Sequence, residues 1–286
     1  GGAGVLAADR LGVVRRLLRA GGTAIIGLFA GRYLQGDIRR PALLLATGVL
    51  ASATLAMATA STLLGLALAW TVAGLALLSL LGTYRGLPAA DEGVRRTRRA
   101  FLVADGALWA AVIVAEIAWG GIDLRTLGAD AATLTGDQVA TTTVATLLVV
   151  AAIGRSALLP LGDWLPATLA APTPVSALLH AGVVNAGGVL LVTMSPVFGA
   201  STVATAIAFT AGAATAVHAT AVMLTKSDIK GALAHSTAGQ MGFMVMTCGL
   251  GLYAAAIFHL VAHGMYKAAL FLGSGGALDR GRRHEE

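Results

Sequence analysis

The chain has 286 residues, of which 57% are hydrophobic and 12% are charged, and its mean hydropathy is +0.80. Soluble domains carry roughly 25% charged residues, so this composition excludes a soluble globular fold and predicts an all-α, polytopic membrane protein. The net charge of +6 does not indicate a nucleic-acid partner, because the basic residues lie in short loops between apolar stretches, where they set membrane topology. The single cysteine, Cys248, lies in an apolar stretch, so we expect a small buried hydrophobe there and no internal disulfide.

Nine apolar stretches approach or exceed the length that crosses a bilayer, which is about 20 residues. They are residues 18–34, 41–58, 62–81, 100–119, 139–161, 174–194, 202–225, 231–250 and 253–273. The first is close to the lower length limit, so we expect eight or nine transmembrane helices. We find no cleavable signal peptide and expect the spans themselves to direct insertion.

Basic residues alternate between the two sides of this arrangement. They fill the loop at 85–99, the loops after the first, fifth and seventh spans, and the charged tail at 279–286, whereas the polar loop at 121–138 holds one arginine. This bias places the basic loops in the cytoplasm, and we expect a multi-pass protein of the cell inner (plasma) membrane. With nine spans the arginines between residues 10 and 19 fall on the opposite side, so either 18–34 does not span or an earlier helix is missing.

The last apolar stretch carries three titratable side chains, His259, His263 and Lys267, at positions i, i+4 and i+8. On one helix they form a single stripe about 12 Å long. Each such group inside a bilayer costs roughly 2.5–3.5 kcal/mol, and the default reading of such a stripe is an ion or proton path. Polar packing and a metal shared by the two histidines are the alternatives. Lys267 is followed by apolar residues, which argues against snorkelling to an interface.

Two acids, Asp105 and Glu116, lie in the stretch 100–119. Eleven residues make about three helical turns, so the carboxylates share a face about 16 Å apart along the axis. Burial raises the pKa of a carboxyl group and a nearby cation lowers it, so such groups can be poised to exchange protons. The alternative is that each acid sits at a membrane interface, close to its end of the helix.

The segment 155–174 contains several prolines, and Pro160 and Pro166 interrupt helical hydrogen bonding. Broken helices at membrane depth are tolerated where they are buried in protein or line a cavity. Arg155 precedes this break and could pair with a carboxylate or serve as a cytoplasmic anchor. Thr173 and Pro174 have the residue types of a helix start.

Most of the histidines lie in apolar segments, and two lysines accompany them. Histidine titrates near neutral pH, and a desolvated lysine can do so. We therefore expect a chain of proton sites near the membrane midplane, whereas His218 stands alone and is expected to be structural. The expected sites are Lys267, His263, His259, Lys230, His180, Arg155, His235, Glu116 and Asp105.

The chain shows no separate soluble domain, nucleophile–base pair or cofactor loop, so we expect no enzyme activity by itself and no cofactor or metal. We expect one proton-conducting domain over residues 1–286, with an incomplete first half at 1–154 and a core at 155–286 that holds the broken helix and the histidine–lysine channel.

Three segments carry a family resemblance: PLGDWLPATLAAPTPVSALLHAG, TKSDIKGALAHSTAGQMGFM and AAIFHLVAHGMYKAALFLGSGG. They resemble the antiporter-like membrane subunits of respiratory complex I (subunit L) and of Mrp cation/proton antiporters, best over residues 155–276. The resemblance implies two inverted five-helix repeats, each with a broken helix, around an axis of Lys, His and Glu that carries protons.

The resemblance also assigns positions on that axis. Arg155 falls where the family has a broken-helix lysine, His180 matches a bridging histidine, and the second half-channel is matched by Lys230, His259, His263 and Lys267. This chain departs from the family at Trp70–Thr71, where the family has Trp–Glu, and at Arg155 itself. Arginine does not usefully deprotonate, so these two departures put the first half-channel in doubt.

A narrower resemblance lies in HAGVVNAGGVLLV, TCGLGLYAAAIFHLVAHGMYKA and GTYRGLPAADEGVRRTRRAF. These segments resemble the DabB family, the membrane subunits of two-component inorganic-carbon accumulation systems. The resemblance implies inward flow of protons or another cation that energises a soluble, zinc-containing DabA-like partner, which traps CO2 as bicarbonate. It also implies a longer chain, so we expect a truncated or divergent member.

Two alternatives remain open. The chain could be a subunit of complex I, where it would belong to a translocase, or of an Mrp antiporter, among other membrane subunits. It could also be a non-conducting scaffold, which the missing Glu and the short chain favour.

Overall fold

The computed structural model describes residues 39–84, 86–169, 175–176, 179–180, 182–267 and 270. Within these ranges the protein is helical, and its only β-type pairing is an isolated bridge between Thr62 and Asp123. The helices are α2 (Arg40–Thr59), α3 (Leu63–Leu81), α4 (Pro88–Trp119), α5 (Leu127–Leu134), α6 (Gln138–Arg155), α7 (Trp164–Ala167), α9 (Ala186–Thr193), α10 (Ser195–Phe198), α11 (Thr202–Leu224) and α12 (Ile229–Gly249). Two 3-10 turns, η1 (Gly82–Tyr84) and η2 (Val183–Asn185), join them, and residues 253–267 are also helical.

Five of the described helices are long and apolar enough to cross a membrane: α2 from Pro41, α3, α4, α6 and α11. The helical, membrane-spanning class expected from composition is therefore confirmed. The expected total of eight or nine spans is not confirmed, and the stretch 18–34 lies outside the described residues.

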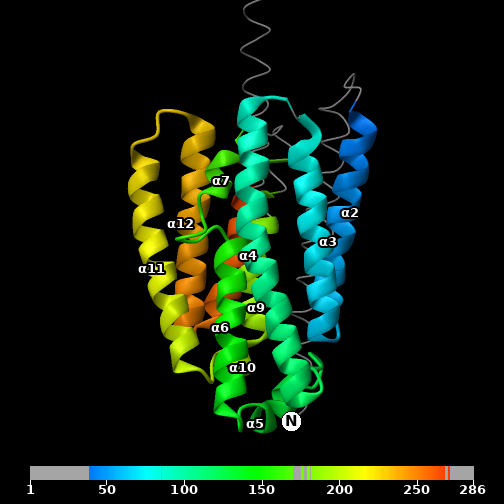
Figure 1. The fold of residues 1–286 in the computed structure, drawn as a ribbon. Helices are drawn as coiled ribbons and strands as arrows, with labels where there is room; N and C mark the ends of the chain where they lie inside the picture. Colours follow the sequence, from blue (N-terminus) through cyan, green and yellow to red (C-terminus); the bar gives the residue numbers. More distant parts are fainter. Residues whose placement is uncertain are drawn as a thin grey trace, which may run out of the picture.

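The helices form a bundle with a paired arrangement (Figure 1). α11 and α12 pack side by side at one flank, α2 and α3 at the other, and α4 packs against α6 between them. The α3–α4 and α11–α12 connections lie at one end, and α5 lies at the opposite end. The basic loops at 85–99 and 225–230 thus share one end of the bundle, as their charge pattern predicts.

Small residues allow the close approach of α11 and α12. A Cβ atom on Gly242 would lie 2.7 Å from the Ala216 amide nitrogen, and one on Gly212 would lie 2.5 Å from the Met246 nitrogen. Lipid tails are as apolar as the helix surfaces, so the hydrophobic effect does not drive two helices together in a bilayer. They associate instead through close packing of this kind. Cys248 on α12 is fully buried, as expected.

Helix α4 begins at Pro88, so the expected loop at 85–99 is largely helical and the expected start at residue 100 is wrong. Proline suits the first helical position, and Glu92 forms ion pairs with both Arg95 and Arg96 one turn later. With 32 residues, α4 is about 48 Å long, longer than the roughly 30 Å hydrocarbon core. Its first turns therefore extend beyond the apolar layer.

Two further expected boundaries are corrected by the structure. The polar loop at 121–138 contains the short helix α5. The stretch 174–194 is not one continuous helix, because η2 separates the helical residues 179–180 from α9. A short apolar stretch cannot by itself distinguish a continuous helix from an interrupted one.

The expected broken helix is confirmed, although it breaks earlier than expected: α6 ends at Arg155 and not at residue 161. Ala157 follows in the left-handed region, with φ of 55°. The Ser156 hydroxyl donates to the Val184 carbonyl at 2.7 Å, and the Leu159 amide donates to Thr215 Oγ1 at 2.9 Å. Groups from η2 and α11 thus accept hydrogen bonds from the residues just after the end of α6. Buried polar groups need such partners, because an unpaired one costs free energy.

Candidate functional site

The first charged group of the candidate site is Lys267, which is 1% exposed. Its Nζ atom donates to the Leu233 carbonyl oxygen at 3.2 Å and to Ser236 Oγ at 3.0 Å, both on α12. Both of these partners are neutral, so among the described residues the ammonium is stabilised by dipoles and not by a counter-ion. A lysine held in this way can exchange a proton without breaking an ion pair.

His263 and His259 lie on the same helical segment, as their spacing predicts. Their rings stack at a centroid distance of 5.9 Å and an interplanar angle of 12°. Both ring nitrogens of His263 are buried and have no hydrogen-bond partner among the described residues, and the same holds for Nε2 of His259. The ring of His259 also packs against that of Phe243 on α12, at a centroid distance of 5.3 Å. Buried polar atoms are normally satisfied, so these nitrogens mark a place where a water or a transferred proton could be accommodated.

His180 reaches this group from a different part of the chain. It is fully buried and lies within electrostatic reach of both Lys267 and His263. The structure therefore brings together four of the expected sites, and it adds Ser236, which sequence reasoning missed. We call this group the relay cluster; it consists of His180, Ser236, His259, His263 and Lys267.

Arg155 and Asp105 form a second charged centre. Arg155 is 1% exposed, and its NH2 atom lies 2.8 Å and 2.9 Å from the two carboxylate oxygens of Asp105, while its Nε atom lies 3.1 Å from Oδ1. The same NH2 donates to the Trp70 carbonyl oxygen at 3.0 Å, and Trp70 Nε1 donates to Asp105 Oδ1 at 2.8 Å. Of the two readings of Arg155, the structure supports the carboxylate partner and not the solvent-exposed anchor.

Aromatic and small residues complete this centre. The guanidinium carbon lies 4.0 Å from the ring centroid of Phe101 and 4.9 Å from that of Trp70. A Cβ atom at Gly74 would lie 2.3 Å from Arg155 NH2, so only glycine leaves room for the guanidinium. Where the family resemblance expects a glutamate, Thr71 Oγ1 accepts a hydrogen bond from Trp109 Nε1 at 3.0 Å. The carboxylate beside Arg155 comes instead from α4.

The remaining expected sites lie at other positions of α4 and α12. Glu116 is exposed in the last turn of α4 and does not join the relay cluster. Lys230 is half-buried at the second residue of α12. His235 is half-buried in the second turn of α12, within electrostatic reach of Lys226, His218 and Asp228. Among the residues that the structure describes, no three His, Cys, Asp or Glu side chains converge where they could hold a metal.

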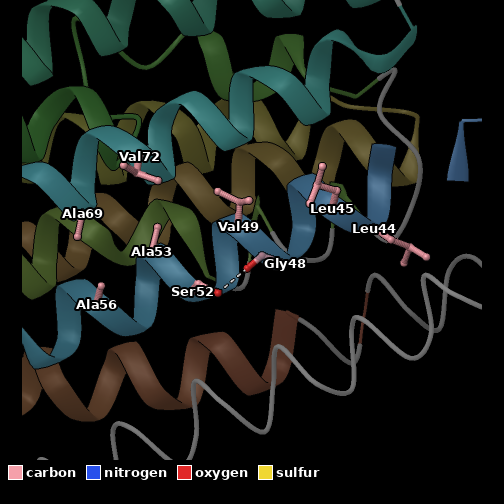
Figure 2. Close-up of a pocket in the computed structure, with 9 residues that line it drawn as sticks. All are labelled: Leu44, Leu45, Gly48, Val49, Ser52, Ala53, Ala56, Ala69 and Val72. Atoms are coloured by element: carbon pink, nitrogen blue, oxygen red, sulfur yellow. Dashed lines mark hydrogen bonds between the residues drawn. The ribbon is translucent and has the colours of Figure 1, made fainter. Parts of the chain in front are cut away.

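A groove also runs along the outer face of α2 and α3 and encloses about 610 Å³ (Figure 2). Its lining is apolar apart from Ser52, whose hydroxyl donates to the Gly48 carbonyl at 2.9 Å. The lining contains no titratable side chain, and none of its residues belongs to the two charged centres.

Comparison with known proteins identifies the family and the fold of the chain. Residues 60–286 match the family described as NADH:quinone oxidoreductase/Mrp antiporter, TM. A relative from Halothiobacillus neapolitanus, named "Probable inorganic carbon transporter subunit DabB1", is 38% identical over 99% of this chain and 51% of its own length. NAD(P)H-quinone oxidoreductase chain 5 from Synechocystis is 38% identical over 70% of this chain and 30% of its own.

The solved structure of the Mrp complex from Dietzia matches 91% of this chain and 29% of the matched chain, with a TM-score of 0.83 and 29% identity. The chain thus spans about half the length of the DabB1 relative and less of the other two. The family model matches residues 60–286, and the chain shares its fold with the Mrp complex. The chain therefore belongs to the NADH:quinone oxidoreductase/Mrp antiporter transmembrane family.

Proposed function

We propose that this chain conducts protons as the membrane subunit of an inorganic-carbon transporter, and that the relay cluster carries them. The single observation that supports this most directly is the setting of Lys267. Within the described residues this buried lysine is hydrogen-bonded to neutral groups alone, beside His263 and His259, which have ring nitrogens without a hydrogen-bond partner there. Ionisable groups inside a membrane are expensive and generally functional. Similarity to a named inorganic-carbon transporter subunit over 99% of this chain favours that class of transporter.

The proton would pass between groups on separate elements. Lys267 and His263 come from the segment 253–267, Ser236 from α12, and His180 from the segment before η2. A neutral imidazole nitrogen can accept a proton while the other gives one up, and a lysine amine can do the same when it is desolvated. Lys230 and His235, nearer to the α11–α12 connection, would join the cluster to the aqueous side. Glu116, at the far end of α4, would at most serve as an outer acceptor.

The partner follows from the same proposal. We infer a soluble, zinc-containing DabA-like subunit that uses the proton flow to hydrate CO2; similarity to a relative named as one subunit of an inorganic carbon transporter supports a partner of this kind. The complex would reside in the inner (plasma) membrane. A subunit of a respiratory or Mrp complex is the second candidate, and similarity to a quinone oxidoreductase chain and to the Mrp structure favours it.

Reconstitution tests the proton function. Proteoliposomes that contain the protein and an internal pH-sensitive dye should acidify when an external acid pulse is applied. Lys267→Ala should abolish this proton flux without changing the elution volume on size exclusion. Arg125→Ala, which removes an exposed cation between α4 and α5, should leave the proton flux unchanged. Full flux in the Lys267→Ala protein would overturn the proposal.

A growth assay separates the two candidate complexes. A bacterial strain that lacks carbonic anhydrase grows poorly in air, and co-expression of the protein with its soluble zinc partner should restore growth. Restoration only together with quinone-reducing subunits, or only sodium-dependent proton flux, would favour the second candidate.

A further inference from the structure

We propose that Arg155 and Asp105 form a permanently charged ion pair that does not take part in proton transfer. This inference rests on the proposed function, because it states which of the buried charges in a proton-conducting protein do not move protons. It also changes the expectation from the sequence, in which both residues stand on the proton path.

The first argument is the number of interactions that a single proton would disrupt. Asp105 accepts three contacts from the Arg155 guanidinium and one hydrogen bond from Trp70 Nε1, at distances between 2.8 and 3.1 Å. A bidentate, charge-assisted pair is the strongest common form of hydrogen bonding in proteins. A proton arriving on Asp105 would leave a guanidinium that is 1% exposed without its counter-ion.

The second argument is that the guanidinium cannot turn away to release the carboxylate. The guanidinium is packed against the rings of Phe101 and Trp70. It also lies so close to Gly74 that a Cβ atom added there would be 2.3 Å from Arg155 NH2. Arginine cannot lose its own proton under these conditions, so it cannot become a neutral acceptor. The pair differs in this respect from Lys267, whose described partners are a hydroxyl and a carbonyl.

The third argument is the position of the pair at the point where α6 ends. Arg155 is the last residue of α6, and it ties this end to the backbone of α3 and to the side chain of α4. The next residue, Ser156, donates to the Val184 carbonyl oxygen in η2. The ion pair therefore fixes the position of the C-terminal end of α6, after which the chain is not helical until α7.

Infrared spectroscopy on the unmodified protein tests the charge state. With aspartate labelled with 13C at its side-chain carboxyl, any labelled C=O stretch of a protonated carboxyl group seen from about pH 6 to about pH 9 would come from a buried aspartate, because ordinary aspartates titrate near pH 3.9. We expect no such band, either at rest or under a proton gradient. A labelled band in this range that responds to pH or to the gradient, and that is missing from the Asp105→Asn protein, would overturn the inference.

An apolar replacement tests the function. Exchange of a whole buried ion pair for hydrophobic residues is often tolerated, whereas loss of one partner is not. Arg155→Leu combined with Asp105→Leu should keep proton flux in liposomes within about threefold of the natural protein, while either single change should lose at least about tenfold or fail to fold.

A folded double variant with flux lost as completely as in Lys267→Ala would show that the pair carries protons. If the double variant does not fold, the infrared result on the natural protein still decides. Lys267→Ala separates the two ideas: flux lost in that variant together with a titrating Asp105 would reject the fixed pair and retain the proposed function.

Discussion

Lys267 and Ser236 lie 31 positions apart in the sequence, yet the lysine Nζ atom donates to the serine hydroxyl across 3.0 Å. This bond joins the segment 253–267 to α12. We expect Ser236→Ala to lower proton flux by about tenfold, because a hydrogen bond to a charged group is worth roughly 1.5–3 kcal/mol and 1.36 kcal/mol corresponds to tenfold in rate. Flux in liposomes measures the effect, and Ser52→Ala, on the outer face of α2, should change nothing. Equal flux in both variants would contradict a role for Ser236.

His263 should show opposite effects on stability and on flux. Its buried ring nitrogens have no hydrogen-bond partner among the described residues, and a buried unsatisfied group costs roughly 1–3 kcal/mol. We therefore expect His263→Leu to leave the melting temperature in detergent unchanged or raised, while proton flux falls by at least about tenfold. His218→Leu, at an exposed position of α11, is the matched control and should keep full flux. A marked loss of stability in His263→Leu would indicate that the imidazole packs as a structural group.

Gly74 should tolerate no side chain. A methyl group there would lie 2.3 Å from Arg155 NH2, and the guanidinium cannot move without losing Asp105. We expect Gly74→Ala to destabilise the protein by about 3 kcal/mol, the range of overpacking combined with a disturbed buried ion pair. Gly48→Ala on α2 is the control, because no atom lies within 4 Å of its added methyl group. Thermal unfolding in detergent compares the two, and equal melting temperatures would refute the tight fit.

Gly242 should matter for the contact between α11 and α12. Its added methyl group would meet the Ala216 nitrogen and the Gly212 carbonyl oxygen at 2.7 Å, both of them backbone atoms that cannot rotate away. We expect Gly242→Ala to separate the two helices and to cost at least about 2 kcal/mol. Gly106→Ala, with nothing within 4 Å, should be neutral or slightly stabilising because alanine favours helix over glycine. Native-state proteolysis of the α11–α12 connection would report the loosening, and unchanged cleavage in Gly242→Ala would count against it.

Sequence periodicity predicted features that lie on one helix and missed those that join two. The stripe of His259, His263 and Lys267 follows from spacing alone. Ser236 and Trp70 could not be found in this way, because their partners are 31 and 35 positions distant and no period connects them.

The boundary errors have a different cause. Hydropathy detects apolar layers and not helices, so the charged first turns of α4 read as a loop although Pro88 and the ion pairs of Glu92 favour helix there. Similarly, α6 was expected to run to residue 161, but Pro160 disfavours helical hydrogen bonding in the turn before it, and the helix ends at Arg155.

The first turns of α4 pack closely against the segment that follows α6. A Cβ atom at Gly93 would lie 2.6 Å from the Ala167 carbonyl oxygen. In the same contact, the NH1 atom of Arg96 lies 3.6 Å from Oδ2 of Asp163. Because α4 also carries Asp105, this contact and the ion pair of Asp105 with Arg155 lie on one continuous helix, so a displacement of the first turns of α4 would be passed along the helix to that ion pair.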